Sequence, residues 1–367
     1  MSTQSSLPVN LALQGGGAHG AFTWGVLDAL LEDGRIRPVA ISGTSAGAMN
    51  AVALAQGLLD DGAEGARASL RRFWKAVADS VPALVGMLPM QNLGTGAVPW
   101  MTLALDWTRH LGPANFNPLD INPLREVVQA QFNFERLRRE TPVKLLVATT
   151  EADTGRTRLF TEEEISCEVL LASACLPTLF HPVVIDGVAY WDGGYSANPA
   201  VLPLVAEGRA RDTLLVLLNP LHYAQTPQTG ADIQARLSAM SVQAGFLREM
   251  QLLAQAQQRA RRRWWPADRL DRLLARSRFH LLDGGALLGE LSVESKMMVQ
   301  HDFLLTLFEQ GRALATQWLA RHGAQLGQAA SVDLSRVFTA CGAALPLPAL
   351  PAPDAPASGR SASDRPA

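Results

Sequence analysis

The sequence has few cysteines and little net charge, and each shortage argues against a class of protein. Its 367 residues include three cysteines, Cys167, Cys175 and Cys341, an odd number without the spacing of metal ligands. This pattern favours free thiols in a reducing compartment over a disulfide framework or a structural metal site. The formal net charge of −2 gives no support for nucleic-acid binding by the chain as a whole.

Long apolar runs are also missing. No stretch approaches the roughly twenty consecutive apolar residues that cross a bilayer. Residues 1–10 lack both the basic and the apolar segment of a secretory signal. We therefore expect a cytoplasmic protein, with any membrane contact peripheral and on the inner membrane face. Hydrophobic residues make up 48% of the chain, which suffices for a large core.

An alternation of strand and helix patterns opens the chain. Short apolar runs at 9–13 and 38–42 read as buried strands, and each precedes a helical pattern, at 18–33 and 46–59. Strands that alternate with helices in this way form parallel sheets covered by helices on both faces. The pattern predicts an α/β fold, a three-layer α/β/α sandwich.

Later strand patterns make the predicted sheet mixed in direction. Further strands are expected at 143–150 and 213–218. Asp186-Gly187 separates apolar runs at 183–185 and 188–190, which is a strong hairpin signal. The central sheet should therefore be mostly parallel and partly mixed.

A glycine-rich loop follows the first predicted strand: Gly15, Gly16, Gly17, Ala18, His19 and Gly20. At the start of a helix its backbone N–H groups converge, and the helix dipole favours an anion there. The spacing also fits the dinucleotide fingerprint, which expects an acidic residue roughly twenty positions on, at the end of the second strand. That strand ends Ile41-Ser42-Gly43 without a carboxylate, so we expect an anion there and not a dinucleotide.

A second motif follows the second predicted strand: Gly43, Thr44, Ser45, Ala46 and Gly47. A strand, this tight turn and a small-residue helix are the context of a nucleophile elbow, in which Ser45 would be exposed above the strand end. Both turns leave the carboxyl ends of parallel strands, where such sheets place their sites. The glycine loop would then donate N–H groups to the oxyanion formed when Ser45 attacks a carbonyl.

A serine nucleophile needs a base, and two assignments fit the sequence. The order Ser45, Asp192, His280 matches an α/β-hydrolase triad, although that fold usually has several strands before its elbow and here two are predicted. The other assignment uses an aspartate alone. The string Asp192-Gly193-Gly194 follows a predicted strand, and a second such string, Asp283-Gly284-Gly285, occurs later.

The ordered motifs GGGAHG, GTSAG and DGG, with the run at 170–201 that leads into the last of them, resemble the patatin-like phospholipase family. The resemblance implies a Ser–Asp dyad without histidine, metal or cofactor, with Ser45 as nucleophile and Asp192, the aspartate that carries the extended likeness, as base. It also implies an oxyanion hole at Gly15, Gly16, Gly17 and Ala18. The family commonly has Lys or Arg where this chain has His19, so any charge there would depend on pH.

The resemblance further implies a catalytic domain and an activity, while helical periodicity and composition indicate how the rest of the chain is organised. We expect a flexible N-terminus, a patatin-like catalytic domain, a mainly helical C-terminal region packed on it and a disordered tail rich in Pro and Ala, at 1–8, 9–220, 221–344 and 345–367 respectively. The predicted activity is phospholipase A-like or lysophospholipase-like hydrolysis of an acyl lipid. The Ser-His-Asp esterase and a catalytically silent lipid-binding or regulatory module remain as alternatives.

Two segments are predicted to contact membranes. Residues 81–107 are apolar and irregular, as in a lid or lipid-contacting surface. Residues 259–278 place many arginines around Trp264-Trp265, a combination that suits an anionic membrane interface. The lipid head group, the acyl position, the choice between hydrolysis and transacylation, and the oligomeric state are left open by the sequence.

Overall fold

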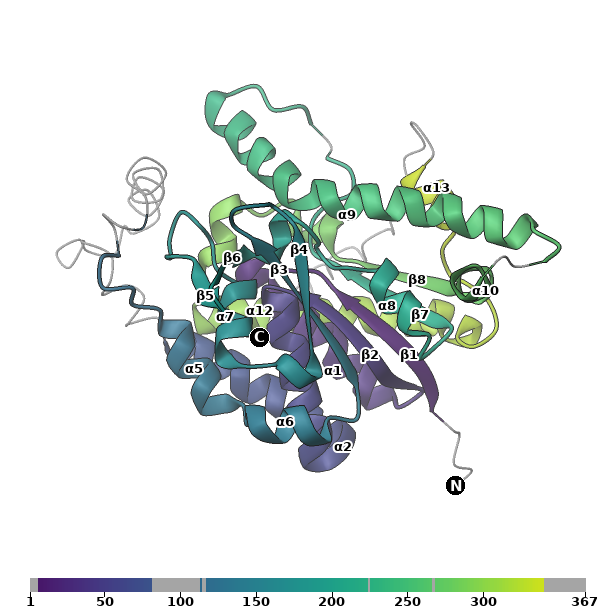
Figure 1. The fold of residues 1–367 in the computed structure, drawn as a ribbon, viewed down its shortest axis with the longest axis horizontal. Helices are drawn as coiled ribbons and strands as arrows, with labels where there is room; N and C mark the ends of the chain where they lie inside the picture. Colours follow the sequence, from purple (N-terminus) through teal and green to yellow (C-terminus); the bar gives the residue numbers. More distant parts are fainter. Residues whose placement is uncertain (1–5, 81–112, 114–116, 224, 266–267, 340–367) are drawn as a thin grey trace, which may run out of the picture.

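The computed structural model describes residues 6–80, 113, 117–223, 225–265 and 268–339, which form one sheet with helices on both faces (Figure 1). The sheet has eight strands in the order β5-β6-β3-β2-β1-β7-β8, and β4 also pairs with β3. The strands are β1 (Leu7–Leu13), β2 (Ile36–Thr44), β3 (Lys144–Glu151), β4 (Thr157–Thr161), β5 (Val183–Ile185), β6 (Val188–Asp192), β7 (Asp212–Leu217) and β8 (Arg278–Asp283).

The strand directions confirm the predicted fold class. The strands β3, β2, β1, β7 and β8 run parallel to their neighbours. At one side of the sheet β4 and β6 are antiparallel to β3, and β5 and β6 form the predicted hairpin. The sheet is therefore mostly parallel and partly mixed.

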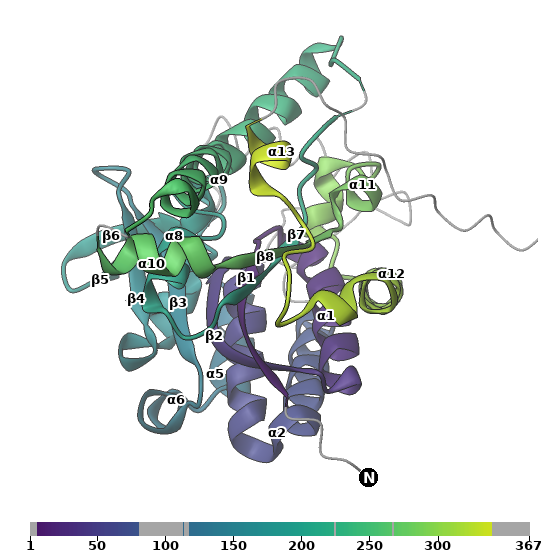
Figure 2. The same ribbon diagram turned by 90° about the vertical axis from the view of Figure 1, so that its right-hand side faces the viewer.

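The helices cover both faces of the sheet, as the two views in Figures 1 and 2 show. On one face lie α1 (Gly20–Asp33), α2 (Ala46–Asp79) and α12 (His301–His322); on the other lie α8 (Leu202–Glu207), α9 (Gly230–Arg262) and α10 (Arg269–Arg276). The shorter helices are α5 (Pro123–Gln131), α6 (Phe134–Glu140), α7 (Cys167–Ser173), α11 (Gly285–Leu288) and α13 (Leu334–Phe338), with 3-10 turns η1 (Gly17–His19), η2 (Glu162–Glu164), η3 (Gly193–Tyr195), η4 (Val293–Met297) and η5 (Gly323–Gln325). None of the helices in the described residues is both long and apolar enough to cross a bilayer.

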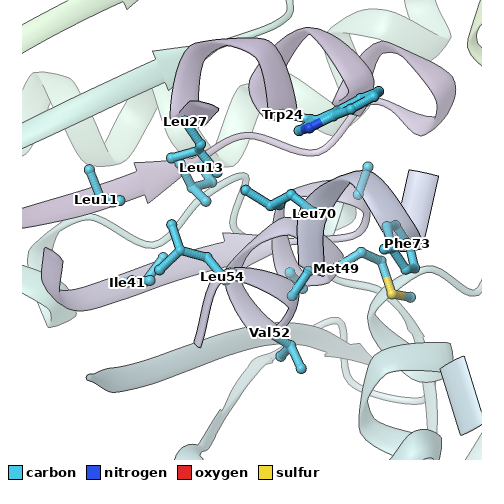
Figure 3. Close-up of a cluster of buried hydrophobic side chains, with 14 of the residues drawn as sticks. Leu11, Leu13, Trp24, Leu27, Ile41, Met49, Val52, Leu54, Leu70 and Phe73 are labelled. Atoms are coloured by element: carbon cyan, nitrogen blue, oxygen red, sulfur yellow. The ribbon is translucent and has the colours of Figure 1, made fainter. Parts of the chain in front are cut away.

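Strand β1 shows why both faces need a cover. Val9, Leu11 and Leu13 belong to the core on the α1 and α2 side, part of which Figure 3 shows, whereas Ala12 belongs to the core under α8 and α9. All four side chains are fully buried. A strand buried on both faces reads as a continuous apolar run, which is the signature of a parallel sheet.

The structure extends the sequence-based elements in three places. The helix expected at 46–59 continues to Asp79 as α2, with a break at Asp61 and Gly62, where Gly62 has φ +55°. Strands β4 and β8 were not predicted. Because β8 pairs with β7, the region 221–344 contributes a strand to the sheet as well as helices. The division of the chain into domains stays a prediction, and both the insert at 81–107 and the tail at 345–367 lie outside the described residues.

Candidate active site

Ser45 occupies a sharp turn between β2 and α2. Its φ of +53° and ψ of −123° are uncommon for a residue with a side chain, and the surrounding structure must hold such a conformation. The Ser45 backbone N–H donates to Ser173 Oγ at 2.9 Å, and the Ser173 hydroxyl donates to the Ala148 carbonyl on β3 at 2.7 Å. The turn is thereby fastened to the neighbouring strand.

The glycines that flank Ser45 are required by close backbone contacts. A Cβ at Gly43 would lie 2.6 Å from the Gly47 carbonyl oxygen. A Cβ at Gly47 would lie 2.2 Å from the Leu13 carbonyl oxygen of β1. These contacts are with backbone atoms that cannot rotate away, so the small residues bring α2 against the ends of both strands.

The glycine loop lies against the Ser45 turn. A Cβ on Gly15 would be 2.5 Å from the Thr44 carbonyl oxygen and 2.9 Å from Ser45 Cβ. The Gly15 N–H donates to Asn198 Oδ1 at 2.7 Å. Gly16 and Gly17 stand at the start of η1, where backbone N–H groups have no partner within the turn. The start of a helix beside a hydroxyl is suited to binding a developing anion.

Asp192 ends β6 and is 5% exposed. Its backbone N–H donates to the Cys175 carbonyl at 2.8 Å, and its Oδ1 accepts the Gly194 N–H at 2.7 Å. Burial raises the pKa of Asp192 to about 6, while hydrogen bonds from the Gly194 N–H and the Ser45 hydroxyl partly oppose the shift. The structure thus brings Ser45 and Asp192, 147 positions apart in the chain, to the wall of one cavity, where the Ser45 hydroxyl is near enough to influence the pKa of the carboxyl.

The competing residues lie elsewhere. His280, in β8, pairs through Nε2 with Asp212 Oδ1 at 2.9 Å and through Nδ1 with Ser331 Oγ at 3.1 Å. Asp283, which begins the other DGG string, accepts the Gly285 N–H at 2.8 Å in a turn. Neither residue lines the cavity that contains Ser45 and Asp192.

A cavity of about 270 Å³ opens over the two residues. Its polar wall includes the loop from Gly15 to Ala18, Ser45 and Asp192, and no histidine from the described residues lines it. Most of the remaining wall is apolar: Ala46, Met49, Phe73, Trp74, Val77, Leu124, Ala174, Leu176, Phe180, Val242, Met297 and Val299. Groups of three or more His, Cys, Asp or Glu side chains placed to hold a metal do not occur in the described part of the chain.

His19 is buried beneath the glycine loop. Its Nε2 lies 2.7 Å from Ser295 Oγ, whose hydroxyl donates to the Ser292 carbonyl, so the hydrogen-bond network makes Nε2 the donor. Burial, with a smaller contribution from nearby Lys296, lowers the pKa of His19 to about 4. The imidazole is therefore uncharged at neutral pH and anchors the loop to η4.

Three polar residues around the loop had not been identified from the sequence. Gln14 accepts the backbone N–H groups of Leu218 and Asn219 at 2.7 and 2.9 Å and donates to the Asn198 carbonyl at 3.2 Å. Asn198, four positions after the end of the DGG string, also accepts the Gly15 N–H through Oδ1. Lys296 comes from η4 and lines the cavity, and no motif marks it in the sequence.

The predicted basic surface at 259–278 is partly exposed. Trp264 and Trp265, beyond the end of α9, are 90% and 78% exposed. Some of its arginines are used within the fold, because Arg278 pairs with Asp212 at 2.6 Å and Arg261 donates to the Ser277 carbonyl. Three others, Arg269, Arg272 and Arg276, line a hollow at the amino ends of β1, β7 and β8, the edge of the sheet opposite Ser45, together with Arg209 and Arg211 from outside this range.

Comparisons with known proteins give one match in sequence and several in fold. A family model described as patatin-like phospholipase matches residues 11–205, more than half of the chain. No curated protein matches the chain. The structure of VipD from Legionella pneumophila is 17% identical in sequence, with a TM-score of 0.40. The match covers 86% of this chain and 67% of the VipD chain. Full-length ExoU of Pseudomonas aeruginosa, in complex with SpcU, is 18% identical with a TM-score of 0.26. That match covers 91% of this chain and 67% of the ExoU chain.

Proposed function

This chain belongs to the patatin-like phospholipase family, and we propose that it hydrolyses carboxylic esters of phospholipids or lysophospholipids with Ser45 as nucleophile and Asp192 as base. The observation that carries the proposal is that the Ser45 hydroxyl, the buried Asp192 carboxylate and a loop of backbone amides line one cavity. These are the three groups that acyl transfer needs: a nucleophile, a base and oxyanion donors.

In the proposed reaction Ser45 Oγ attacks the ester carbonyl carbon while Asp192 takes its proton. The negative charge on the carbonyl oxygen is stabilised by the N–H groups of Gly16, Gly17 and Ala18, and Gly15 holds the loop through Asn198. The C–O bond then breaks, and Asp192 returns the proton to the departing alcohol. Water, deprotonated by Asp192, frees the acid from acyl-Ser45 and restores both side chains.

The pKa of Asp192 supports its role as the base. An ordinary aspartate, with a pKa near 3.9, is a weak base at neutral pH. Burial raises the pKa of Asp192 to about 6, which makes its carboxylate a stronger proton acceptor that is still mostly ionised at pH 7. A histidine is then not needed between serine and aspartate.

The apolar wall of the cavity supports an acyl lipid as the substrate. Phe73, Trp74 and Val77 from α2 and Leu176 and Phe180 from the segment after α7 line the cavity beside Ser45. A wall of this composition binds hydrocarbon and leaves few polar groups to recognise sugars or peptides. The acyl chain would lie along it while the ester reaches Ser45.

The test is turnover of a panel of phospholipids, lysophospholipids and glycerides by the purified chain and by two variants. Ser45→Ala and Asp192→Asn are each expected to lower turnover at least a thousandfold. Asp283→Asn is the matched control, because Asp283 begins the same DGG string but lies outside the cavity, and this variant should keep normal turnover. Substantial turnover by Ser45→Ala would refute the proposal.

A further inference from the structure

Lys296 places a positive charge in the wall of the cavity. The chain has three lysines, at 75, 144 and 296, and Lys296 is the only basic side chain among the described residues that line the cavity. Among the described residues of that wall, Asp192 has the only carboxylate. Lys75 and Lys144 pair with Asp79 and Glu162, whereas Lys296 has no carboxylate partner in the described part of the chain.

The hydrogen bonds of Lys296 leave donors unused. Its Nζ donates to Asn219 Oδ1 at 2.7 Å, and no other partner of the ammonium group occurs among the described residues. An ammonium carries three N–H donors and no acceptor, so two donors remain. Burial of the ammonium group also lowers the pKa of Lys296.

Asn219 adds another unused donor at the same place. Because Lys296 can only donate, the atom facing it must be the amide oxygen, and this fixes the orientation of the Asn219 amide. Asn219 Nδ2 is then a buried N–H donor without a partner in the described structure. Buried donors are nearly always hydrogen-bonded, so this N–H group calls for an acceptor that the described residues do not supply.

The place of Lys296 connects these donors to the reacting ester. A Cβ on Gly17 would lie 2.3 Å from the Lys296 carbonyl oxygen, so the backbone of η4 lies directly against the glycine loop. The Asn219 backbone N–H is held by Gln14, the residue before that loop. The residues that carry the unused donors therefore both lie beside the glycine loop.

We propose that Lys296 and Asn219 form a subsite for a phosphate, which binds the head-group phosphate of the substrate. This inference rests on the proposed hydrolysis at Ser45 and specifies its substrate: esters that carry a phosphate near the scissile bond, in preference to neutral glycerides. Phosphate oxygens accept several N–H bonds at once and favour a positive partner, which matches an ammonium beside an amide. The only other charge in the described wall, the Asp192 carboxylate, is needed by the chemistry.

A different role for Lys296 would give a different kinetic result. If its ammonium stabilised the oxyanion at the ester, its loss would lower kcat for every ester to a similar degree. A phosphate subsite instead acts on binding of one class of substrate. The informative quantity is therefore the ratio of kcat/KM for a monoacylglycerol phosphate to kcat/KM for the monoacylglycerol with the same acyl chain.

The kinetic experiment compares this ratio in four proteins. Lys296→Met removes the charge at similar length, and Asn219→Asp places a carboxylate where the phosphate would bind. Each should lower the ratio at least tenfold, mainly by raising KM for the phosphorylated substrate. Lys144→Met, which removes a lysine outside the cavity, should leave the ratio at the wild-type value. An unchanged ratio in both test variants would overturn the subsite.

A binding experiment separates this inference from the proposed reaction. In the Ser45→Ala background, sn-glycerol 3-phosphate and inorganic phosphate are titrated by calorimetry, with glycerol as control. Binding of either phosphate that falls at least tenfold on adding Lys296→Met supports the subsite even if no ester is hydrolysed. Binding of glycerol 3-phosphate but not of inorganic phosphate assigns the subsite to the lipid head group. If wild type hydrolyses esters but the Ser45→Ala variant binds neither glycerol 3-phosphate nor inorganic phosphate, the subsite is refuted and the proposed function stands.

If Lys296→Met does not fold, as its melting temperature would show, Lys296→Arg replaces it. Arginine keeps the charge but not the point geometry of an ammonium. The ratio of kcat/KM values should then fall in both Lys296→Arg and Asn219→Asp, to different degrees. Equal ratios in wild type and both variants would contradict the subsite.

Discussion

Burial of one carboxylate determines much of the chemistry proposed for this chain. Asp192 is 5% exposed at the end of β6, and its pKa is raised to about 6. Removal from water disfavours the ionised form, and two hydrogen bonds recover part of that loss. The burial that makes the carboxylate a stronger base also destabilises the folded state when Asp192 is ionised.

The raised pKa predicts the pH dependence of hydrolysis. The base must be ionised, so kcat/KM on a soluble short-chain ester should be constant above about pH 7 and fall about tenfold per pH unit below about pH 6. His19, with its pKa lowered to about 4, should add no step between pH 6 and 8. Full activity maintained down to pH 4.5 would contradict Asp192 as the base.

The same shift predicts a stability effect. A folded-state pKa above the unfolded value of 3.8 means that Asp192 stabilises the fold at low pH and that this contribution is lost as pH rises through about 6. The Asp192→Asn variant can still accept the Gly194 N–H. At pH 7 its unfolding free energy should therefore equal that of wild type or exceed it by up to about 3 kcal/mol. Urea unfolding at pH 5 and pH 7 measures this, and a large loss of stability at pH 7 would show that the carboxylate is structural.

At the scale of residues, the sequence predicted the groups whose role depends on the local conformation of the backbone. Ser45 was predicted because an elbow needs small neighbours, and the contacts at Gly43 and Gly47 explain that requirement. Gln14 and Lys296 were missed because their importance comes from partners about 200 or more positions away, or from facing a cavity. No periodicity or spacing in one sequence encodes such contacts.

At the scale of elements, α1 and α12 cross in backbone contact. A Cβ on Gly25 would lie 1.9 Å from the Phe308 carbonyl oxygen, and a Cβ on Gly311 would lie 2.0 Å from the Phe22 carbonyl oxygen. Each glycine thus lets the other helix approach. This crossing joins α12, from the C-terminal region, to the helix that begins at the glycine loop.

Gly311→Ala should therefore destabilise the protein although alanine favours a helix. Separating two backbones costs about 1–3 kcal/mol, which exceeds the gain in helix propensity of about 1 kcal/mol. We expect a lower urea midpoint and a lower melting temperature. Gly230→Ala, at the start of α9 with no atom within 4 Å of the added Cβ, is the control and should have little effect. Equal stability of the two variants would refute the close crossing.

Strands were predictable where their apolar pattern is continuous. The buried runs of β1, β2, β3 and β7 were recognised, as was the hairpin around Asp186-Gly187. β8 was missed because it contains Arg278 and His280, which look solvent-exposed in sequence. Both are compatible with the sheet because they pair with Asp212 at the start of β7, and such compensation becomes visible only in three dimensions.

At the scale of the whole molecule, the C-terminal region completes the candidate site. It supplies β8 to the sheet, Ser295 beneath His19 and Lys296 to the cavity wall. The family model ends at residue 205, before all three. The motifs therefore predicted the chemistry proposed for this chain, whereas the features that would set its substrate lie beyond them.

The basic surface at 259–278 gives a second prediction at this scale. Arg269, Arg272 and Arg276 are exposed on α10, and we propose that they contact anionic lipid head groups. Changing all three to Gln should lower co-sedimentation with phosphatidylserine vesicles at least tenfold. Because this surface lies at the opposite edge of the sheet from Ser45, turnover of a monomeric ester should not change.

A charge-matched variant controls for the loss of positive charge. Arg71, Arg72 and Arg139 are exposed arginines on α2 and α6. Changing these three to Gln should leave vesicle binding intact. Vesicle binding that is the same in both triple variants and in wild type would remove the membrane contact from this surface.

The measurement that tests the central claim most directly is labelling with a fluorophosphonate, followed by mass spectrometry of the digested protein. A dyad of Ser45 and Asp192 predicts one adduct per chain, located on Ser45, formed at a rate that falls as Asp192 is protonated below about pH 6 and nearly absent in Asp192→Asn. An adduct on another residue, or labelling of Ser45 at the same rate in the Asp192→Asn variant, would contradict it.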